Sequence, residues 1–153
     1  MSPRKPAPDT AVEQVDTRFL DSLVGYNARR ATLVIVDAFL RSMAVYGLRP
    51  VDFSVLSLIG HNPGITSRQL CATLNLQPPN LVGMVNQLQA RELIVRRPHP
   101  HDGRAMGLHL TAAGRKMMRQ AEVTAFELEE AATARLSVAE RKTLMQLLQK
   151  IYL

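Results

Sequence analysis

The sequence predicts a mainly helical fold with one small β-hairpin. Apolar residues recur at helical spacing along most of the 153 residues. The composition favours helices too, because hydrophobic residues make up 46% of the chain while aromatic residues make up only 5%. Val95–Gly114 departs from this pattern: a short apolar segment gives way to proline, histidine and glycine, becomes basic, and resumes as the alternating "MGLHLT". The length fits about one domain.

A long first helix is predicted from about Asp16 to Tyr46, with Gly47 as its C-terminal cap and Pro50 as a helix breaker. Residues 1–15 are expected to form a disordered tail, and no apolar segment follows their basic residues as it would in a signal peptide. The apolar stripe of the first helix consists of Leu20, Leu23, Val24, Ala31, Val34, Ile35 and Ala38.

Two shorter helices and a turn are expected next. One helix is predicted to begin near Asp52, its N-cap, and to end at "NPG", and Thr66 can cap a third helix, "SRQLCATL". A three-residue turn, "NLQ", separates the third helix from a fourth, Pro78–Arg91. Proline is tolerated in a first helical turn, because the N–H that it lacks has no acceptor there.

A hairpin and a fifth helix follow. Ile94–Arg97 and Met106–Leu110 are the two predicted strands. Thr111 is the expected N-cap of the fifth helix, which extends to about Arg135.

The last helix begins at Ser137 and Glu140, which have the spacing of a capping box. Its apolar face and that of the first helix lie at the two ends of the chain, so we expect a second copy of the chain to cover them. The predicted organisation is one domain, 16–153, in which 16–47 and 111–153 form the dimerisation region and 52–110 the central lobe. The predicted dimer interface contains Leu20, Leu144, Leu147, Leu148 and Ile151.

The charge of the chain restricts its partners. A formal net charge of +6 and an isoelectric point near 10.1 favour nucleic acid or an anionic membrane surface. No apolar segment reaches the roughly 20 residues that span a bilayer, and no membrane partner is expected. The single cysteine, Cys71, excludes an intrachain disulfide framework and fits a cytoplasmic location.

Thr66–Arg91 has the layout of a helix-turn-helix, whose second helix enters the major groove of DNA. An ordinary helical hairpin within a core is the alternative, and the spacing alone does not separate the two. The hairpin that follows favours the first, because a helix-turn-helix followed by a β-hairpin forms a winged helix. The sequence therefore predicts a winged helix-turn-helix lobe that binds double-stranded DNA. A winged-helix module that binds protein without DNA is the alternative.

The predicted wing is basic. Residues 91–119 contain seven of the 19 Lys and Arg residues, against Glu92 and Asp102. Arg104 follows the loop tip and can enter a minor groove, where narrow A·T stretches concentrate negative potential. Phosphate repels Asp102, so this residue is expected to brace Arg104 or to cap the turn. A solvated basic face without a partner is the alternative. The seven basic residues are Arg91, Arg96, Arg97, Arg104, Arg115, Lys116 and Arg119.

Leu74–Gly114 resembles the core of the MarR (multiple antibiotic resistance regulator) family, and the helix layout from Asp16 to Leu153 is similar as well. The resemblance implies a homodimeric winged-helix transcriptional regulator, usually a repressor, on a pseudo-palindromic operator. It also implies release from DNA by a small aromatic or anionic effector. Pro78–Arg91 would be the recognition helix, and Arg104 the wing arginine. The matching motifs are D-x-R (Asp102, Arg104), L-x-L-T-x-x-G (Leu108, Leu110, Thr111, Gly114) and "RRP" (Arg96, Arg97, Pro98).

The recognition helix departs from the family at two places. The family commonly has Arg or Lys where this chain has Gly83, and no basic residue occurs between Gln69 and Ala90. Bidentate arginine contacts with guanine are therefore not available from this helix. Gly83 lowers helix stability by roughly 1 kcal/mol relative to alanine and can let the backbone approach DNA. Glu92 replaces the family's glycine after the helix and has to adopt a strained cap or end the helix in another way.

We expect polar side chains to read the bases. Asn80, Asn86 and Gln87 can pair with adenine, and Leu81 or Met84 can touch a thymine methyl. The predicted DNA contacts are Thr66, Ser67, Gln77, Pro78, Pro79, Asn80, Leu81, Gly83, Met84, Gln87, Arg96, Arg97, His101 and Arg104.

Asn27, Arg30 and His61 are the candidate effector-binding residues. Asn27 interrupts the apolar stripe of the first helix, and His61 ends the second helix near the place of the family's pocket. A bond to a neighbouring helix is the alternative for Asn27, and a helix-end cap is the alternative for His61. The positive charge of Arg29 and Arg30 favours an anion, and the resemblance implies a small aromatic acid.

No cofactor, metal or catalytic residue is expected. Cys71 could sense oxidants, but the family's sensing cysteine lies near the N-terminus, so a small buried residue is the better explanation. His99, His101 and Asp102 resemble a metal site without a fourth ligand. The sequence has no paired carboxylates, Ser–His–Asp set or Gly-rich phosphate loop, so an enzyme is not expected.

Overall fold

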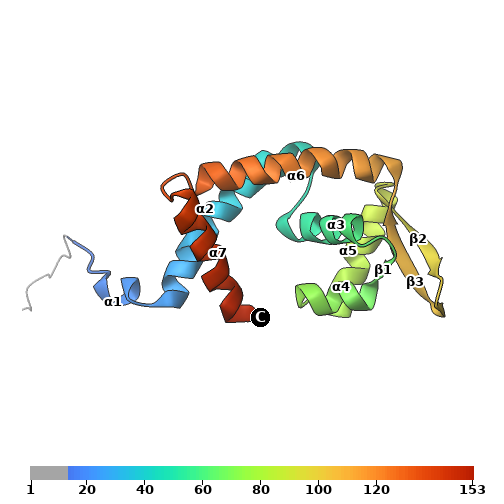
Figure 1. Cartoon of the computed structure of the whole chain (residues 1–153), viewed down its shortest axis with the longest axis horizontal. Coiled ribbons are helices and arrows are strands. Elements are labelled where there is room, and N and C mark those ends of the chain that lie inside the picture. Colours follow the sequence, from blue (N-terminus) through green and yellow to red (C-terminus); the bar gives the residue numbers. More distant parts are fainter. Residues whose placement is uncertain (1–13) are drawn as a thin grey trace, which may run out of the picture. The chain divides into compact units, whose positions relative to one another are not determined.

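The computed structural model describes residues 14–153, apart from the side chain of Asp102. These residues are mostly helical with one small antiparallel sheet, which confirms the predicted fold class (Figure 1). Most of the predicted tail, 1–15, lies outside the described residues. The chain forms two compact units, which divide after Leu33 and are described separately. The elements are α1 (Arg18–Asp21), α2 (Val24–Met43), η1 (Ala44–Tyr46), α3 (Pro50–His61), β1 (Ile65–Thr66), α4 (Ser67–Leu74), α5 (Pro78–Ala90), β2 (Ile94–His99), β3 (Asp102–Leu110), α6 (Ala112–Ala132) and α7 (Val138–Tyr152).

The prediction of one unbroken helix from Asp16 to Tyr46 is wrong at its start. Ser22 and Leu23 separate α1 from α2. The Nδ2 of Asn27 donates to the carbonyls of Asp21 and Leu23, each at 2.8 Å, and the Ser22 hydroxyl donates to the Phe19 carbonyl at 2.7 Å. These side-chain bonds join residues on the two sides of the break, and they stabilise the corner.

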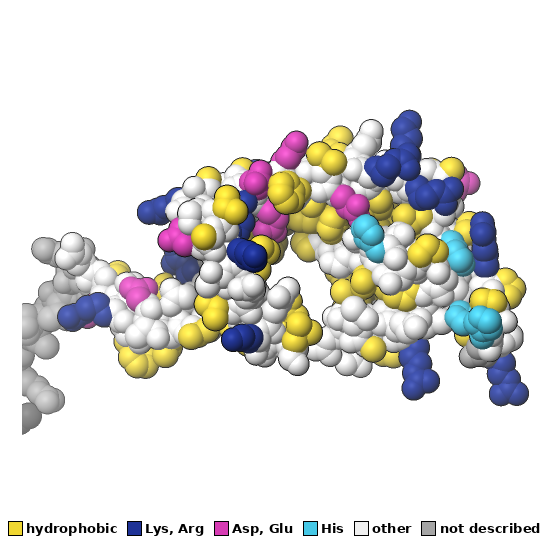
Figure 2. Space-filling view, viewed as in Figure 1, with side chains coloured by type: hydrophobic (Ala, Val, Ile, Leu, Met, Phe, Trp, Pro, Cys, Tyr) yellow, Lys and Arg dark blue, Asp and Glu magenta, His cyan; other side chains and the backbone are white. Residues whose placement is uncertain are grey.

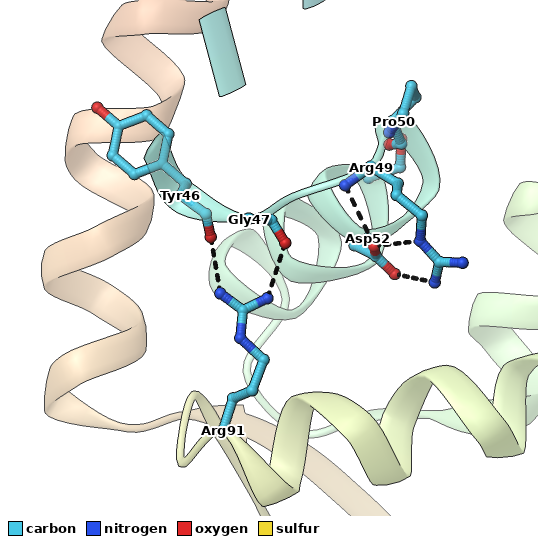
Figure 3. A network of polar contacts seen from close by, with 7 residues as sticks. Tyr46, Gly47, Arg49, Pro50, Asp52 and Arg91 are labelled. Carbon is cyan, nitrogen blue, oxygen red and sulfur yellow. Dashed lines mark hydrogen bonds and ion pairs between the residues drawn. The ribbon is translucent and has the colours of Figure 1, made fainter. Parts of the chain in front are cut away.

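Helix α3 begins three residues earlier than predicted. Arg49 is its N-cap, and Asp52 lies in its first turn rather than before it. Asp52 accepts hydrogen bonds from the backbone N–H of Arg49 at 3.2 Å and from the Arg49 guanidinium at 2.7 and 2.9 Å (Figure 3). Burial by itself would raise the pKa of Asp52, but the hydrogen bonds and charge of Arg49, with the charge of Arg91, hold that pKa below its usual value.

Three caps predicted from the sequence are confirmed. The hydroxyls of Thr66, Thr111 and Ser137 accept the backbone N–H three residues later, at 2.9 to 3.3 Å. Glu92 has a φ of 57°, so of the two alternatives considered for this residue the structure has the strained cap. The helix begun by Thr111 ends at Ala132, before the predicted Arg135.

The sheet has one strand more than predicted. Its order is β1-β3-β2, and β1 pairs antiparallel with β3, Ile65 opposite Leu108. β2 reaches His99, with an irregularity between Pro98 and His99, and β3 begins at Asp102. The two longer strands therefore extend the hairpin beyond the predicted ends toward its tip.

One hydrophobic core lies within the unit Val34–Leu153. Helix α3 contacts α6 and β3, and α4 contacts α5, so the helix-turn-helix and the hairpin are attached to the same core. Cys71 is partly buried and packs against it. The buried members are Met43, Leu48, Val55, Leu56, Ile59, Leu70, Leu81, Val85, Leu88, Leu93, Ile94, Leu108, Leu110, Met118, Ala121 and Leu128.

Candidate nucleic-acid interface

Helix α5, the predicted recognition helix, has one apolar and one polar face. Leu81 is 1% exposed and Met84 9% exposed, so both pack inward. The prediction that these two side chains touch a thymine methyl is therefore wrong. With Val85 and Leu88 they form the inward stripe at helical spacing. The exposed residues of α5 are Pro78, Pro79, Asn80, Val82, Gly83, Asn86, Gln87, Gln89 and Ala90.

Val82 is the apolar side chain that the sequence prediction missed. It is 53% exposed and lies beside the exposed Gly83. An exposed valine on the second helix of a helix-turn-helix is suited to contact a thymine methyl. Helical spacing could have identified Val82, because this residue does not belong to the inward stripe that contains Leu81 and Val85.

The first turn of α5 offers few backbone donors. Pro78 and Pro79 have no N–H, and the N–H groups of Asn80 and Leu81 both bond to the Gln77 carbonyl, at 3.0 and 3.2 Å. A phosphate at this helix end would therefore meet few of the free backbone N–H groups that usually bind an anion at a helix N-terminus. The exposed side chains of Gln77 and Asn80 are therefore the contact groups here.

Gly83 lies on the exposed face, and a Cβ added to it would meet no atom within 4 Å. Changing Gly83 to Ala is expected to raise the free energy of unfolding by roughly 1 kcal/mol, because glycine is a poor helix former. If the helix backbone approaches DNA at Gly83, the same change weakens DNA binding. Denaturant unfolding and a DNA titration measure the two effects. An unchanged affinity in a stabilised variant would contradict the close approach.

Helix α4 places Ser67 and Arg68 on the surface at its start. Thr66 is half-buried, and its hydroxyl is already hydrogen-bonded within the chain. It accepts from the Gln69 N–H and donates to the Gln69 Oε1 at 2.9 Å. Thr66 thus orients the start of α4, while Ser67 is the more accessible of the two predicted contacts. Arg68, which the sequence prediction did not select, adds a positive charge beside them.

The wing is linked to the recognition helix. The Arg96 Nη2 donates to the Asn86 Oδ1 at 2.8 Å, which joins β2 to α5 and orients the Asn86 amide. Arg97, His101 and Arg104 are exposed. Figure 2 shows Lys, Arg and His side chains gathered at the β2–β3 end of the lobe. The hairpin therefore presents positive charge next to the exposed face of α5.

The two histidines of the wing contact each other. Their rings are edge-to-face with centroids 6.1 Å apart, and the His101 N–H lies 3.3 Å from the His99 Nδ1. No group of three or more His, Cys, Asp or Glu that could hold a metal occurs among the described residues. The side chain of Asp102, the third residue considered for such a site, lies outside the described part of the structure.

Two of the seven basic residues near the wing are used inside the lobe. Arg91 donates from Nη2 to the Tyr46 carbonyl at 2.7 Å and from Nη1 to the Gly47 carbonyl at 3.0 Å (Figure 3). Arg115 donates to the Leu110 carbonyl at 2.9 Å. These guanidiniums are thereby committed to backbone groups, which reduces what they can offer to phosphate.

A cavity of about 790 Å³ lies between α2, α3, α6 and α7, within the unit Val34–Leu153. His61, one of the candidate effector-binding residues, lines it, and its Nε2 lies 2.9 Å from the Glu122 Oε1. Asn27 and Arg30 do not line it: Asn27 bonds to the α1–α2 corner, and Arg30 lies over the Tyr26 ring. The cavity walls are mainly apolar and include Phe39, Phe53, Phe126, Leu144, Met145 and Leu148.

The predicted dimer residues are exposed on the single chain. Leu147 is 55% exposed and Ile151 69%, as on a surface without its partner. Leu144 and Leu148 also line the cavity, so the face of α7 that carries the predicted interface residues borders the cavity as well. Leu20, in α1, is 42% exposed.

Among the described residues no single helix is long and apolar enough to cross a membrane, although the bent pair Val24–Tyr46 and Pro50–His61 meets both criteria together.

A short helix, a turn, an exposed helix face and a basic hairpin on one core define a winged-helix DNA-binding protein. The sequence model of the MarR family matches residues 46–105. A transcriptional regulatory protein for the hcr operon of Thauera aromatica is 32% identical over 149 residues, 97% of this chain and 89% of that protein. The chain belongs to the MarR family of transcriptional regulators, a dimeric family.

Solved structures agree with this assignment. The repressor CouR bound to a 23-mer DNA duplex has a TM-score of 0.85 and 34% identity, and covers 91% of this chain and 99% of its own. CouR bound to p-coumaroyl-CoA has a TM-score of 0.79 and 34% identity, and covers 90% and 97%. The similarity therefore extends over nearly the whole chain, beyond the winged-helix lobe.

Proposed function

We propose that this protein is a repressor that binds a pseudo-palindromic operator as a homodimer and leaves it when a small ligand binds. The observation that carries the DNA-binding part is the polar, exposed face of α5 beside the basic wing, fixed to it by the Arg96–Asn86 bond. The similar repressor CouR was solved bound to a 23-mer DNA duplex, which supports DNA binding by this chain. The helix-turn-helix would read bases, and the wing would contact the backbone or minor groove. Such a regulator would act in the cytoplasm.

The contacts proposed for DNA follow from exposure. Base readout would come from Asn80, Val82, Asn86 and Gln87, with Gly83 as the point of close approach. Gln77, Pro78, Pro79 and Ser67 would border the groove, and Thr66 would act by orienting α4. Arg97, His101 and Arg104 would contact DNA from the wing, while Arg96 would do so through Asn86.

Changing Arg104 to Ala is expected to weaken binding to many DNA sequences alike. It should also lower the slope of log affinity against log salt by about one unit, because one phosphate contact releases about one counterion. Fluorescence anisotropy with operator and unrelated duplexes over a salt series measures both quantities. Arg135→Ala is the matched control, since it removes the same charge from the exposed turn after α6.

This salt series also separates DNA binding from a role in protein binding alone. A wild-type protein whose affinity for duplex DNA is weak and independent of salt would contradict the DNA-binding proposal. An Arg104→Ala protein with unchanged affinity and slope would remove only the wing arginine from the interface.

We propose that the cavity between α2, α3, α6 and α7 is the effector site. It combines aromatic walls with a few polar groups, which is typical of small-molecule sites. The binding of p-coumaroyl-CoA by CouR supports an effector that contains an aromatic acid unit. The ligand has to bind the DNA-free shape more tightly than the DNA-bound shape, since equal affinity shifts no equilibrium. A series of aromatic acids and their esters that leaves DNA binding unchanged would contradict this part.

A further inference from the structure

Asn86 belongs to the exposed face of α5. It follows Gly83 by three residues and Val82 by four, and residues at these spacings are neighbours on one side of a helix. All three are exposed, while Leu81 and Val85 on the inward side are buried. The Asn86 side chain therefore shares a surface with the groups that are proposed to meet the bases.

Strand β2 of the wing places a guanidinium on this surface. The Arg96 Nη2 donates to the Asn86 Oδ1 at 2.8 Å, and both side chains are exposed. A guanidinium has five N–H donors and no acceptor, so the amide oxygen of Asn86 has to face it and the amide nitrogen has to point elsewhere. Among the described residues, neither the Nδ2 of Asn86 nor the Nη1 and Nε of Arg96 has a hydrogen-bond partner.

The bond changes what Asn86 can offer to a base. A free asparagine amide pairs with adenine, because its oxygen accepts from the N6 amino group while its nitrogen donates to N7. Here the oxygen is already engaged, and an adenine amino group that approached it would meet the guanidinium, which is another donor. Asn86 and Arg96 together thus present only donors to a base.

Guanine is the base whose major-groove edge complements a pair of donors. Its O6 and N7 both accept hydrogen bonds, whereas adenine has one acceptor beside a donor, thymine one acceptor beside a methyl group, and cytosine a donor. Helix α5 contains no lysine or arginine of its own. The guanidinium that this recognition helix lacks is therefore supplied by the neighbouring strand.

We propose that Arg96 and Asn86 of each subunit act together to select one guanine in each half-site of the operator. The inference rests on the proposed DNA-binding function and names a base that the site selects. Arg96 is the specificity-determining residue of the two, because it supplies donors to the guanine and also prevents Asn86 from pairing with adenine. The sequence favoured adenine for Asn86, since the bond to Arg96 joins residues ten positions apart on different elements.

Selection of duplexes from a randomised library, followed by sequencing, tests the pair. The full-length wild-type, Arg96→Ala and Arg97→Ala proteins are each used for a separate selection. For the wild type, a guanine is expected at one fixed position of each half-site. Replacing this G·C pair by A·T in one half-site is expected to weaken binding about tenfold in a DNA titration, the effect of one lost bidentate base contact.

Arg96→Ala is expected to exchange the guanine for adenine at the same position, because the Asn86 amide regains its free oxygen. A residue that only braced the wing would lower affinity without exchanging one base for another. Arg97→Ala is the matched control: it removes the same charge from the next position of β2, whose side chain points to the other face of the strand, and should keep the guanine. Circular dichroism shows that each variant is folded.

The exchange of guanine for adenine is the supporting result. A folded Arg96→Ala protein that keeps the guanine, or that loses all preference at this position, would overturn selection by the pair. If the wild type selects half-sites without a guanine, the inference fails and the DNA-binding proposal stands. If the wild type enriches no sequence and its affinity for duplex DNA is weak and independent of salt, both fail together.

Discussion

Replacing Leu147 by glutamate is expected to turn the dimer into monomers and to lower operator affinity by about a hundredfold or more. Leu147 is a half-exposed apolar residue on α7, a predicted dimerisation helix. A glutamate there would place an unpaired charge in the subunit interface. Two linked recognition helices gain affinity from the effective concentration of the second, and monomers lose that gain. Sedimentation velocity and DNA titration measure the two effects.

Ala139→Glu is the matched control for this substitution. It introduces the same charge into the first turn of the same helix, where a carboxylate is favourable, and it lies away from the apolar face. The control should remain dimeric and bind the operator as the wild type does. A Leu147→Glu protein that stays dimeric at the concentrations of the DNA assay would show that α7 does not hold the subunits together.

Replacing Gly114 by alanine is expected to lower the free energy of unfolding by about 3 kcal/mol. A Cβ at this position would overlap the carbonyl oxygen of Leu93, a backbone atom that also accepts the Thr111 N–H at 3.0 Å. The start of α6 would have to move away from Leu93, in the segment between α5 and β2, and the Thr111 cap on the Gly114 N–H would be strained. Urea unfolding followed by circular dichroism measures the loss.

Gly83→Ala is the control for the Gly114 substitution, because it adds the same methyl group in open space within a helix. The two changes should move stability in opposite directions. A Gly114→Ala protein as stable as the wild type would mean that the contact between α6 and the Leu93 carbonyl relaxes without cost.

Local signals in the sequence predicted much of the fold. The capping residues Thr66, Thr111 and Ser137 act on N–H groups three residues away, so their effect can be inferred without tertiary structure. The prediction of one long helix failed at Ser22 because the apolar spacing continues through the break. The break is stabilised by the bond of Asn27 to the Asp21 carbonyl, which spans six residues and leaves no local signal in the sequence. β1 was missed because two residues of strand become visible only through their pairing with β3.

The candidate site was predicted less completely, for reasons of geometry. Leu81 and Met84 could be assigned to the wrong face because the sequence shows the helical period but not the side that meets the core. Arg91 resembles any other basic residue near the wing until the carbonyls of Tyr46 and Gly47 are seen beside it. Glu122 had no local signal either, since its partners Ser57 and His61 precede it by 65 and 61 residues.

The bond of Arg91 to two consecutive carbonyls removes a degree of freedom from the lobe. One planar guanidinium that reaches both Tyr46 and Gly47 fixes distance and orientation together, which a single contact would not do. The segment that leads into α3 is therefore tied to the end of the recognition helix by a two-point contact. If a ligand in the proposed effector site displaced the start of α3, the Arg91 bonds would pull on the end of α5, and part of the movement would reach the recognition helix.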